Sequence, residues 1–378
     1  MTRRLALALI AILFAASPAL AQAPQRFASE KASFTVETVA GGLQNPWGFA
    51  FLPDGRMLVT ERQGRMRIVS ADGALSQPLS GAPRVDARGQ GGLLDVALDP
   101  DFARNRLVYV SFSEPHDGGR NNTAVARARL NDAANALENL TTIWRQEPSI
   151  ASTMHFGSRL VFARDGTLFV TVGDRYSQRD QAQNPDNAIG KVIHITTDGQ
   201  PAPGNPGLNG VKWNPFIWSI GHRNVQGAAL HPATGQLWTA EHGARGGDEI
   251  NHPEAGKNYG WPVITYGVDY SGAKIGVGTH KDGMEQPVFY WDPSIAPSGM
   301  AFYTGDAFPG WKNSAFVGAL AGQLLARLEF DGDKILREER LLQGFGERIR
   351  DVRQGPDGFL YLLTDGAQGR LLRLKPSN

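Results

Sequence analysis

The sequence contains no cysteine among its 378 residues. This absence excludes disulfide bonds, thiolate zinc sites and cysteine-based catalysis. The chain also lacks an excess of either charge, because 38 lysines and arginines face 37 aspartates and glutamates. We therefore expect no nucleic-acid partner. Beyond the first 21 residues, no apolar run is long enough to span a membrane.

The first 21 residues have the pattern of a secretory signal peptide. Two arginines precede the apolar run 5–16, and Ala19 and Ala21 end the segment with the Ala-x-Ala pattern of a cleavage site. An uncleaved membrane anchor is the alternative, but a serine and a proline interrupt the run before the ~20 residues that cross a bilayer. We expect a mature chain, 22–378, that is periplasmic or secreted and has no membrane span after cleavage.

Glycine, with 45 residues, exceeds its usual share of ~7% and takes part in a repeated pattern. The pattern is a short apolar strand, a turn built on Asp, Pro and Gly, and a second apolar strand. Within each strand, large apolar residues alternate with small or polar ones, and the turn supplies the backbone angles that a hairpin requires. Six copies occur, at 47–62, 93–113, 157–174, 225–243, 298–320 and 350–366.

Six copies at irregular spacings predict an all-β protein, a six-bladed β-propeller of four-stranded blades. The gaps leave room for two more strands per blade. A β-sandwich or two separate β-domains are the alternatives, but neither requires one hairpin signature spread over the whole chain. No linker divides residues 30–375, so we expect one domain, with the last strand (371–376) closing the ring against an early strand (33–40).

Polar side chains gather where the repeated strands begin and end. They are Gln90, His155, Asp174, Arg223, Asn224, Arg348, Arg350 and the acidic loop 241–249. Because they come from different blades, we expect them to converge at one mouth of the ring, where a propeller binds a small molecule.

His155 is the candidate base, because a neutral imidazole accepts a proton near pH 7. Asp174 would hold the other ring nitrogen, although a turn-capping aspartate is the alternative. Arg223 would stabilise an oxyanion that develops opposite the base. The loop 241–262 is rich in oxygen atoms and turns, which favours calcium, while a solvated acidic loop or a transition metal bound by its histidines stays open.

Taken together, these motifs resemble the soluble quinoprotein aldose sugar dehydrogenases of the glucose/sorbosone dehydrogenase family, which use pyrroloquinoline quinone (PQQ). The resemblance covers nearly the whole mature chain, and the family has a six-bladed propeller fold. The motifs are GQGGLLD (89–95), MHFGSRL (154–160), GHRN followed by QG (221–227), EHGARGGDEIN (241–251), KNYGWP (257–262), APSGM (296–300) and ERIRDV (347–352).

The resemblance implies that a hydride passes from C1 of an aldose sugar to C5 of PQQ while a histidine takes the C1 hydroxyl proton, which gives the lactone. An external electron acceptor would then reoxidise the cofactor. The implied catalytic residues are His155 as the base, Asp174 as its orienting partner and Arg223 as the stabiliser of the quinone oxygen. The implied cofactor-binding residues are Gln90, His155, Arg223, Asn224, Ser294, Arg348 and Arg350.

The resemblance also implies Ca²⁺. The backbone carbonyls of Gly243 and Ala244 would hold a calcium ion that bridges the cofactor, and a second ion would lie near Glu249 and Tyr259. The chain departs from the family pattern in having alanine at 244, where proline is common, serine at 294, where the glucose-specific members have threonine, and no lysine in segment 318–323.

Two functions of other kinds remain as alternatives. One is a propeller that only binds a sugar or a protein, and the other is a calcium-dependent lactonase. The oligomeric state is expected to be a monomer or a dimer.

Overall fold

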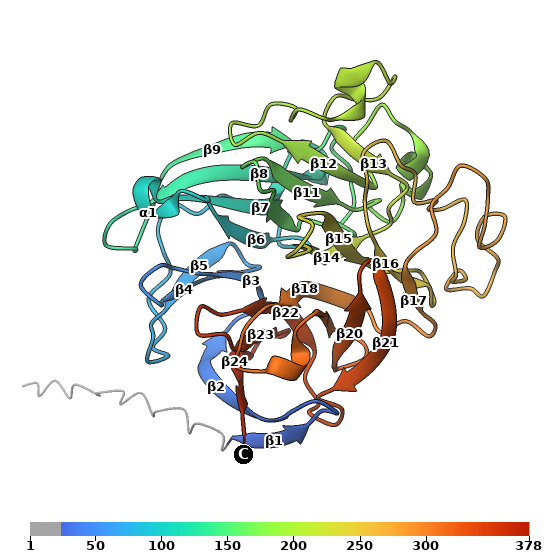
Figure 1. The fold of residues 1–378 in the computed structure, drawn as a ribbon. Coiled ribbons are helices and arrows are strands. Elements are labelled where there is room, and N and C mark those ends of the chain that lie inside the picture. The colour runs from blue at the N-terminus through green and yellow to red at the C-terminus, as the bar shows by residue number, and fades with distance from the viewer. Residues whose placement is uncertain (1–23, 378) are drawn as a thin grey trace, which may run out of the picture.

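The computed structural model describes residues 24–377, and the predicted signal peptide lies outside the described residues. The described chain forms six antiparallel sheets arranged in a ring (Figure 1). This confirms the predicted six-bladed propeller. Within residues 24–377, no helix is long and apolar enough to cross a membrane.

All six predicted hairpins are present. They are β3 (Pro46–Phe51) with β4 (Met57–Glu61), β6 (Leu93–Leu98) with β7 (Leu107–Pro115), β10 (Leu160–Phe162) with β11 (Leu168–Val172), β14 (Val225–Leu230) with β15 (Leu237–Glu241), β18 (Pro297–Tyr303) with β19 (Ser314–Ala319), and β22 (Ile349–Gln354) with β23 (Leu360–Thr364). The glycines of the Asp-Gly turns have the positive φ angles that such turns require, with values of 84° at Gly55, 83° at Gly166 and 77° at Gly358.

The other strands lie outside these hairpins. They are β5 (Arg65–Val69), β8 (Asn121–Leu130), β9 (Leu137–Arg145), β12 (Lys191–Ile195), β13 (Ile217–Ile220), β16 (Asp248–Asn251), β17 (Phe289–Trp291), β20 (Leu325–Asp331) and β21 (Lys334–Leu341). Helical structure is limited to α1 (Phe102–Asn105) and the 3-10 turns η1 (Asp117–Gly119), η2 (Arg179–Gln183), η3 (Pro206–Asn209) and η4 (Pro309–Trp311) in the described chain.

The two ends of the chain close the ring together. Strand β2 (Ser33–Leu43) pairs with β24 (Gly369–Pro376), with Val36 opposite Leu374, so the blue and red ends of the ribbon meet in Figure 1. Strand β1 (Gln25–Ala28) extends this sheet to five strands. The predicted closure of 371–376 against 33–40 is confirmed.

The first sheet has three regular strands, β3 to β5, whereas four of the others have four. The chain after β5 takes the fourth position without becoming a strand. Its backbone follows β5 through bonds from Ser76 N to Ile68 O (2.9 Å) and from Leu79 N to Met66 O (2.9 Å). Pro78 lies between these two donors and has no N–H to give, which accounts for the irregular ladder.

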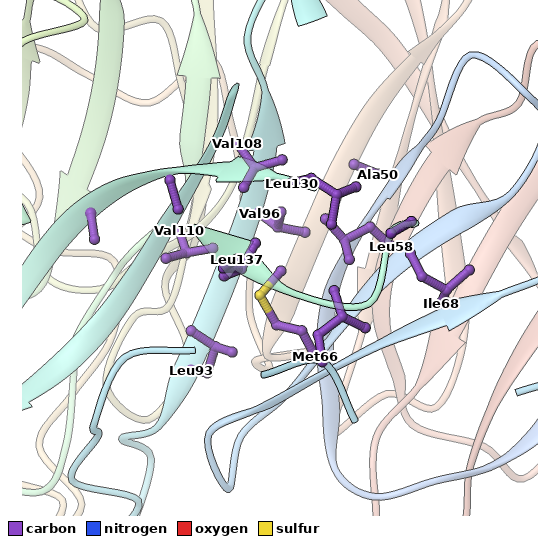
Figure 2. Packing of buried hydrophobic residues seen from close by; sticks show 14 of the residues in the cluster. Ala50, Leu58, Met66, Ile68, Leu93, Val96, Val108, Val110, Leu130 and Leu137 are labelled. Carbon is purple, nitrogen blue, oxygen red and sulfur yellow. The ribbon is translucent and has the colours of Figure 1, made fainter. Parts of the chain in front are cut away.

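The hydrophobic core lies between neighbouring blades. Strands β4, β11, β15 and β23 are buried at every position, which differs from the predicted alternation. The reason is that other sheets cover both faces of these strands. Figure 2 shows one such layer, where Leu58 and Met66 of the first sheet meet Val96, Val108 and Leu137 of the second. Each such side chain stabilises the fold by about 1.5–3 kcal/mol.

The first strand of each blade is the innermost one, and these strands contact one another around the ring. Five of the six have a register shift near their first residues. Such β-bulges change the direction in which side chains point, and they are common beside functional sites. The starts of the inner strands are therefore the place where side chains from several blades converge.

Candidate functional site

Three adjoining cavities lie where the inner strands begin. The first, which we name the arginine cavity, has a volume of about 250 Å³ and is lined by Arg62, Arg348 and Arg350. The histidine cavity, of about 290 Å³, is lined by His155, Asp174 and Arg223. The loop cavity, of about 730 Å³, is lined by Gly243, Ala244 and Ser294.

Shared residues connect the three cavities. His242 and Ala296 line both the arginine cavity and the loop cavity. Ala244 and Tyr270 line both the loop cavity and the histidine cavity. The predicted residues therefore lie around one continuous region. The arginine cavity contains Gln90, Asn224, Arg348 and Arg350, and the histidine cavity contains the candidate base, His155.

His155 and Asp174 form a closely bonded pair. His155 Nδ1 donates to Asp174 Oδ1 at 2.6 Å, and both side chains are buried. In the neutral ring this bond leaves Nε2 unprotonated and able to accept a proton. The other carboxylate oxygen accepts a bond from Trp261 Nε1 at 2.8 Å, which fixes the aspartate. The backbone N–H of His155 donates to Gln90 Oε1 at 2.8 Å, which connects the pair to the arginine cavity.

Arg223 lies between the histidine pair and the loop 241–249. Its backbone carbonyl accepts a bond from Asp174 N at 2.7 Å, and its backbone N–H donates to Glu241 Oε2 at 2.8 Å. Its Nη1 donates to the carbonyl of His242 at 3.2 Å. Its Nε is buried and has no hydrogen-bond partner among the described residues. A buried guanidinium with an unused donor is suited to an anionic oxygen.

The arginine cavity is strongly cationic. Its lining has three guanidinium groups and one carboxylate, that of Asp365, which lies 3.0 Å from Arg348 Nε and 3.4 Å from Arg350 Nη2. Within the described chain, the buried Nε atoms of Arg62 and Arg350 have no hydrogen-bond partner. Two positive charges stay uncompensated by the lining, so an anion is the ligand that this cavity favours.

One wall of the same cavity is apolar. Trp47, Leu94 and Phe156 pack against one another as a small buried cluster and all three line the cavity. An apolar surface surrounded by guanidinium groups is complementary to a flat, aromatic polyanion.

Several lining residues were not singled out from the sequence. They are Asn45, Trp47, Arg62, Leu94, Gln226 and Asp365. A repeat-position signal identifies four of them, and the other two, Arg62 and Asp365, directly follow β4 and β23. Asn45, Asn224, Ala296 and Arg348 each precede an inner strand, while Trp47, Leu94, Gln226 and Arg350 are each the second residue of one. Residues two apart point to the same side of a strand, so equivalent positions in different blades face one space.

The loop cavity is shaped by Asp248, another residue that the sequence reading did not single out. Its Oδ1 accepts a bond from Gly243 N at 2.8 Å, and its Oδ2 accepts bonds from Ser294 Oγ at 2.6 Å and Ile295 N at 2.8 Å. One buried carboxylate therefore holds the predicted calcium loop against the segment that contains Ser294. Burial raises the pKa of Asp248.

Glu249 and Tyr259 lie away from the three cavities. Asn251 Nδ2 donates to Glu249 Oε2 at 3.0 Å and to Glu241 Oε1 at 2.9 Å, which brings two carboxylates together. Burial, followed by repulsion from Glu241, raises the pKa of Glu249 to about 8. A nearby cation would relieve this repulsion. Among residues 24–377 there is no cluster of three or more His, Asp or Glu side chains that could hold a metal ion.

The neighbouring aromatic residues Tyr290 and Trp291 lie outside the three cavities. Trp291 is buried in the core, and its Nε1 donates to Glu338 Oε1 at 3.0 Å. Tyr290 stacks on Tyr266 with ring centroids 4.0 Å apart. Neither residue lines any of the three cavities.

Comparison with known proteins agrees with the geometry. A sequence profile described as Glucose / Sorbosone dehydrogenase matches residues 43–373. The aldose sugar dehydrogenase YliI of Escherichia coli (strain K12) is 47% identical over 350 residues, which are 92% of this chain and 94% of that protein.

Solved structures are similar over the same length. A crystal structure described as glucose dehydrogenase has a TM-score of 0.89 and 50% identity, covering 91% of this chain and 100% of that one. The PQQ-bound form of an aldose sugar dehydrogenase from Streptomyces coelicolor has a TM-score of 0.76 and 31% identity, covering 92% and 99% of the two chains.

Proposed function

Because the chain belongs to the glucose/sorbosone dehydrogenase family, we propose that it is a quinoprotein that oxidises the C1 hydroxyl of aldose sugars to the lactone with PQQ. The observation that carries the proposal is the adjacency of two cavities. One presents a histidine–aspartate pair, and the other presents three guanidinium groups beside an apolar wall.

The arginine cavity fits PQQ, which is a planar tricarboxylate. Arg62, Arg348 and Arg350 supply the charge, and the unpartnered Nε atoms supply hydrogen-bond donors. Gln90 and Asn224, from two other blades, add amide groups to the lining. When bound, PQQ supplies an electrophilic carbon that takes up a hydride.

The residues of the histidine cavity would prepare the sugar for this transfer. His155 Nε2 would take the proton of the C1 hydroxyl, while Asp174 keeps the ring in the required tautomer and stabilises its charged form. Arg223 would place its free Nε toward an oxygen that gains negative charge.

Calcium is part of the proposal. The carbonyls of Gly243 and Ala244 belong to the loop cavity, where the bonds from Asp248 fix the loop. An ion held there would act as a Lewis acid toward the quinone. A second ion near Glu249 and Tyr259 would offset the repulsion between Glu249 and Glu241.

An export route completes the proposal. With a cleaved signal peptide, the enzyme would work in the periplasm or outside the cell and pass electrons to an external acceptor. We propose a monomer or a dimer.

The pH dependence of the reaction tests the role of His155. Burial lowers the pKa of His155, while the hydrogen bond that the ring donates to Asp174 opposes this shift. The ring therefore stays neutral, and able to accept a proton, at pH values above its ordinary pKa of about 6.5. We expect kcat/KM for an aldose to be constant above about pH 6.5 and to fall at lower pH through an apparent pKa below that value. A decline that already begins above pH 7 would contradict this assignment.

A titration tests the function itself. We expect the purified chain, given PQQ and calcium, to change the absorbance of the quinone and to reduce an artificial dye when aldoses are added. Chelation of calcium should lower that activity. Absence of quinone binding would instead favour the propeller that only binds, and hydrolysis of lactones without quinone would favour the lactonase.

A further inference from the structure

Two exposed tyrosines flank the mouth of the histidine cavity. Tyr176 and Tyr270 both line it, and their exposed fractions are 49% and 59%. They come from different blades, since Tyr176 follows β11 and Tyr270 lies on the long connection between β16 and β17 that extends to the right in Figure 1. Large aromatic side chains that stay exposed beside a cavity indicate a binding role.

Tyr176 is held next to the candidate base. Its ring centroid lies 5.3 Å from that of His155, and the two rings are nearly perpendicular at 83°. Its backbone N–H donates to Asp174 Oδ1 at 2.8 Å, on the oxygen that also accepts from His155. One carboxylate therefore positions the imidazole and the tyrosine together.

The backbone beneath Tyr176 is strained. Arg175 and Tyr176 have φ values of 57° and 61°, a left-handed conformation that non-glycine residues rarely adopt. Arg175 holds the turn, because its Nη2 donates to Asn121 Oδ1 at 2.5 Å and to Ser152 O at 2.8 Å. Such strain persists where the surroundings maintain it, and it is frequent at ligand-binding positions.

Tyr270 is hydrogen-bonded to Arg223, another candidate catalytic residue. Arg223 Nη2 donates to the Tyr270 hydroxyl at 3.4 Å. The loop that carries Tyr270 is held to the predicted calcium loop, because Arg245 and Val268 exchange two backbone bonds, at 2.9 and 3.1 Å. The loop backbone that carries Tyr270 is therefore held in place, while the tyrosine ring stays exposed to solvent.

Charged groups link the two loops across the mouth. Arg179 of η2 lies 3.7 Å from Asp269, the neighbour of Tyr270, and both line the histidine cavity. Asp180 lines the same cavity. The opening thus has two aromatic rings together with carboxylate and guanidinium groups, the combination that binds the C–H faces and the hydroxyls of a sugar.

We propose that Tyr176 and Tyr270 form an aromatic clamp that binds the pyranose ring of the aldose over His155 and determines which sugars are accepted. This inference rests on the proposed function. The clamp contacts the sugar before and during the reaction alike, so it contributes to KM and to selectivity more than to kcat.

The test combines kinetics with a measurement of sugar binding. Wild type and the variants Tyr176→Ala, Tyr176→Phe and Tyr270→Ala are loaded with PQQ and calcium and assayed with monosaccharide and disaccharide aldoses. Binding of the same sugars is followed by saturation-transfer NMR without dye. We expect each alanine variant to raise KM about three- to tenfold, with different factors for different sugars and kcat within about twofold. Tyr176→Phe should keep the wild-type KM.

Tyr290→Ala is the matched control, because Tyr290 is 46% exposed but lines none of the three cavities. It should behave as wild type. If wild type oxidises sugars and both alanine variants keep its KM values, the clamp is wrong and the proposed function stands. If wild type binds sugar without oxidising it and the alanine variants lose binding, the clamp stands and the proposed function fails. Wild type that neither binds nor oxidises sugar overturns both.

Discussion

Replacement of His155 by alanine is expected to lower kcat for aldose oxidation by about 10²- to 10⁴-fold, the usual contribution of a positioned proton acceptor. The residue is buried and bonded to Asp174 through Nδ1, so that Nε2 is its proton-accepting atom. His242 is a poor substitute, because its Nε2 bonds to the carbonyl of Pro297 at 2.6 Å. Turnover is measured with an artificial dye at saturating sugar.

The binding of PQQ should survive this change, which separates loss of the base from loss of the cofactor. Asp174→Asn should give a smaller loss of kcat, since the base remains but its orientation and its charged form lose their partner. His280→Ala serves as the control, because its side chain is 67% exposed and pairs only weakly with Asp282 at 3.6 Å. Unchanged turnover in His155→Ala would remove the proposed mechanism.

Replacement of Arg350 by glutamine is expected to weaken the binding of PQQ by about 10- to 100-fold, the effect of one charge-assisted hydrogen bond to a buried anion. Arg350 is buried on the second position of β22, its Nη1 donates to Gln226 Oε1 at 2.9 Å, and its Nε has no partner among the described residues. The dissociation constant is obtained from the absorbance of PQQ or from the quenching of tryptophan fluorescence, since Trp47 lines the same cavity.

The control for this experiment is Arg104→Gln. Its side chain is 78% exposed on α1 and pairs with Asp101 at 2.6 Å, away from the cavities. A thermal melt of Arg350→Gln without PQQ checks that the fold is intact. We expect it to be intact, because the carboxylate of Asp365 keeps Arg348 as its ion-pair partner at 3.0 Å. An affinity for PQQ equal to that of wild type would show that the arginine cavity is not the quinone site.

The two experiments examine separate parts of one region. His155 acts on the sugar from the histidine cavity, while Arg350 acts on the quinone from the arginine cavity. Gln90 lies between them, since it lines the arginine cavity and accepts the backbone N–H of His155. Loss of turnover with intact quinone binding, and loss of quinone binding with an intact fold, are therefore distinguishable results.

The fold was predictable because its signal is local. A turn built on Asp, Pro or Gly between two apolar strands specifies a hairpin within roughly twenty residues, and six copies specify a ring. The closure of 33–40 against 371–376 also followed from pattern, since a ring of blades must join its ends. The three-stranded first sheet was less predictable, because one proline in a weak outer segment decided it.

The candidate site was only partly predictable. Motifs placed His155, Asp174 and Arg223 together, and the structure confirms that they line one cavity. Arg62 was not predicted as a site residue, although it ends the first repeated hairpin and follows β4 directly, as His242 follows β15. Asp248 was overlooked within an acidic loop, where the sequence does not distinguish a buried carboxylate with several backbone donors from a solvated one.

The sequence by itself determined the repeated hairpins, the closed ring and the polar residues at the strand ends, because turn chemistry and strand periodicity act over a few neighbouring residues. The tertiary structure alone decided which of those polar residues share a cavity, that the cavity lining carries excess positive charge, and that two tyrosines from different blades line the cavity of His155. These properties depend on distances between atoms that lie far apart in the chain, and only the packing of blades around a common axis determines such distances.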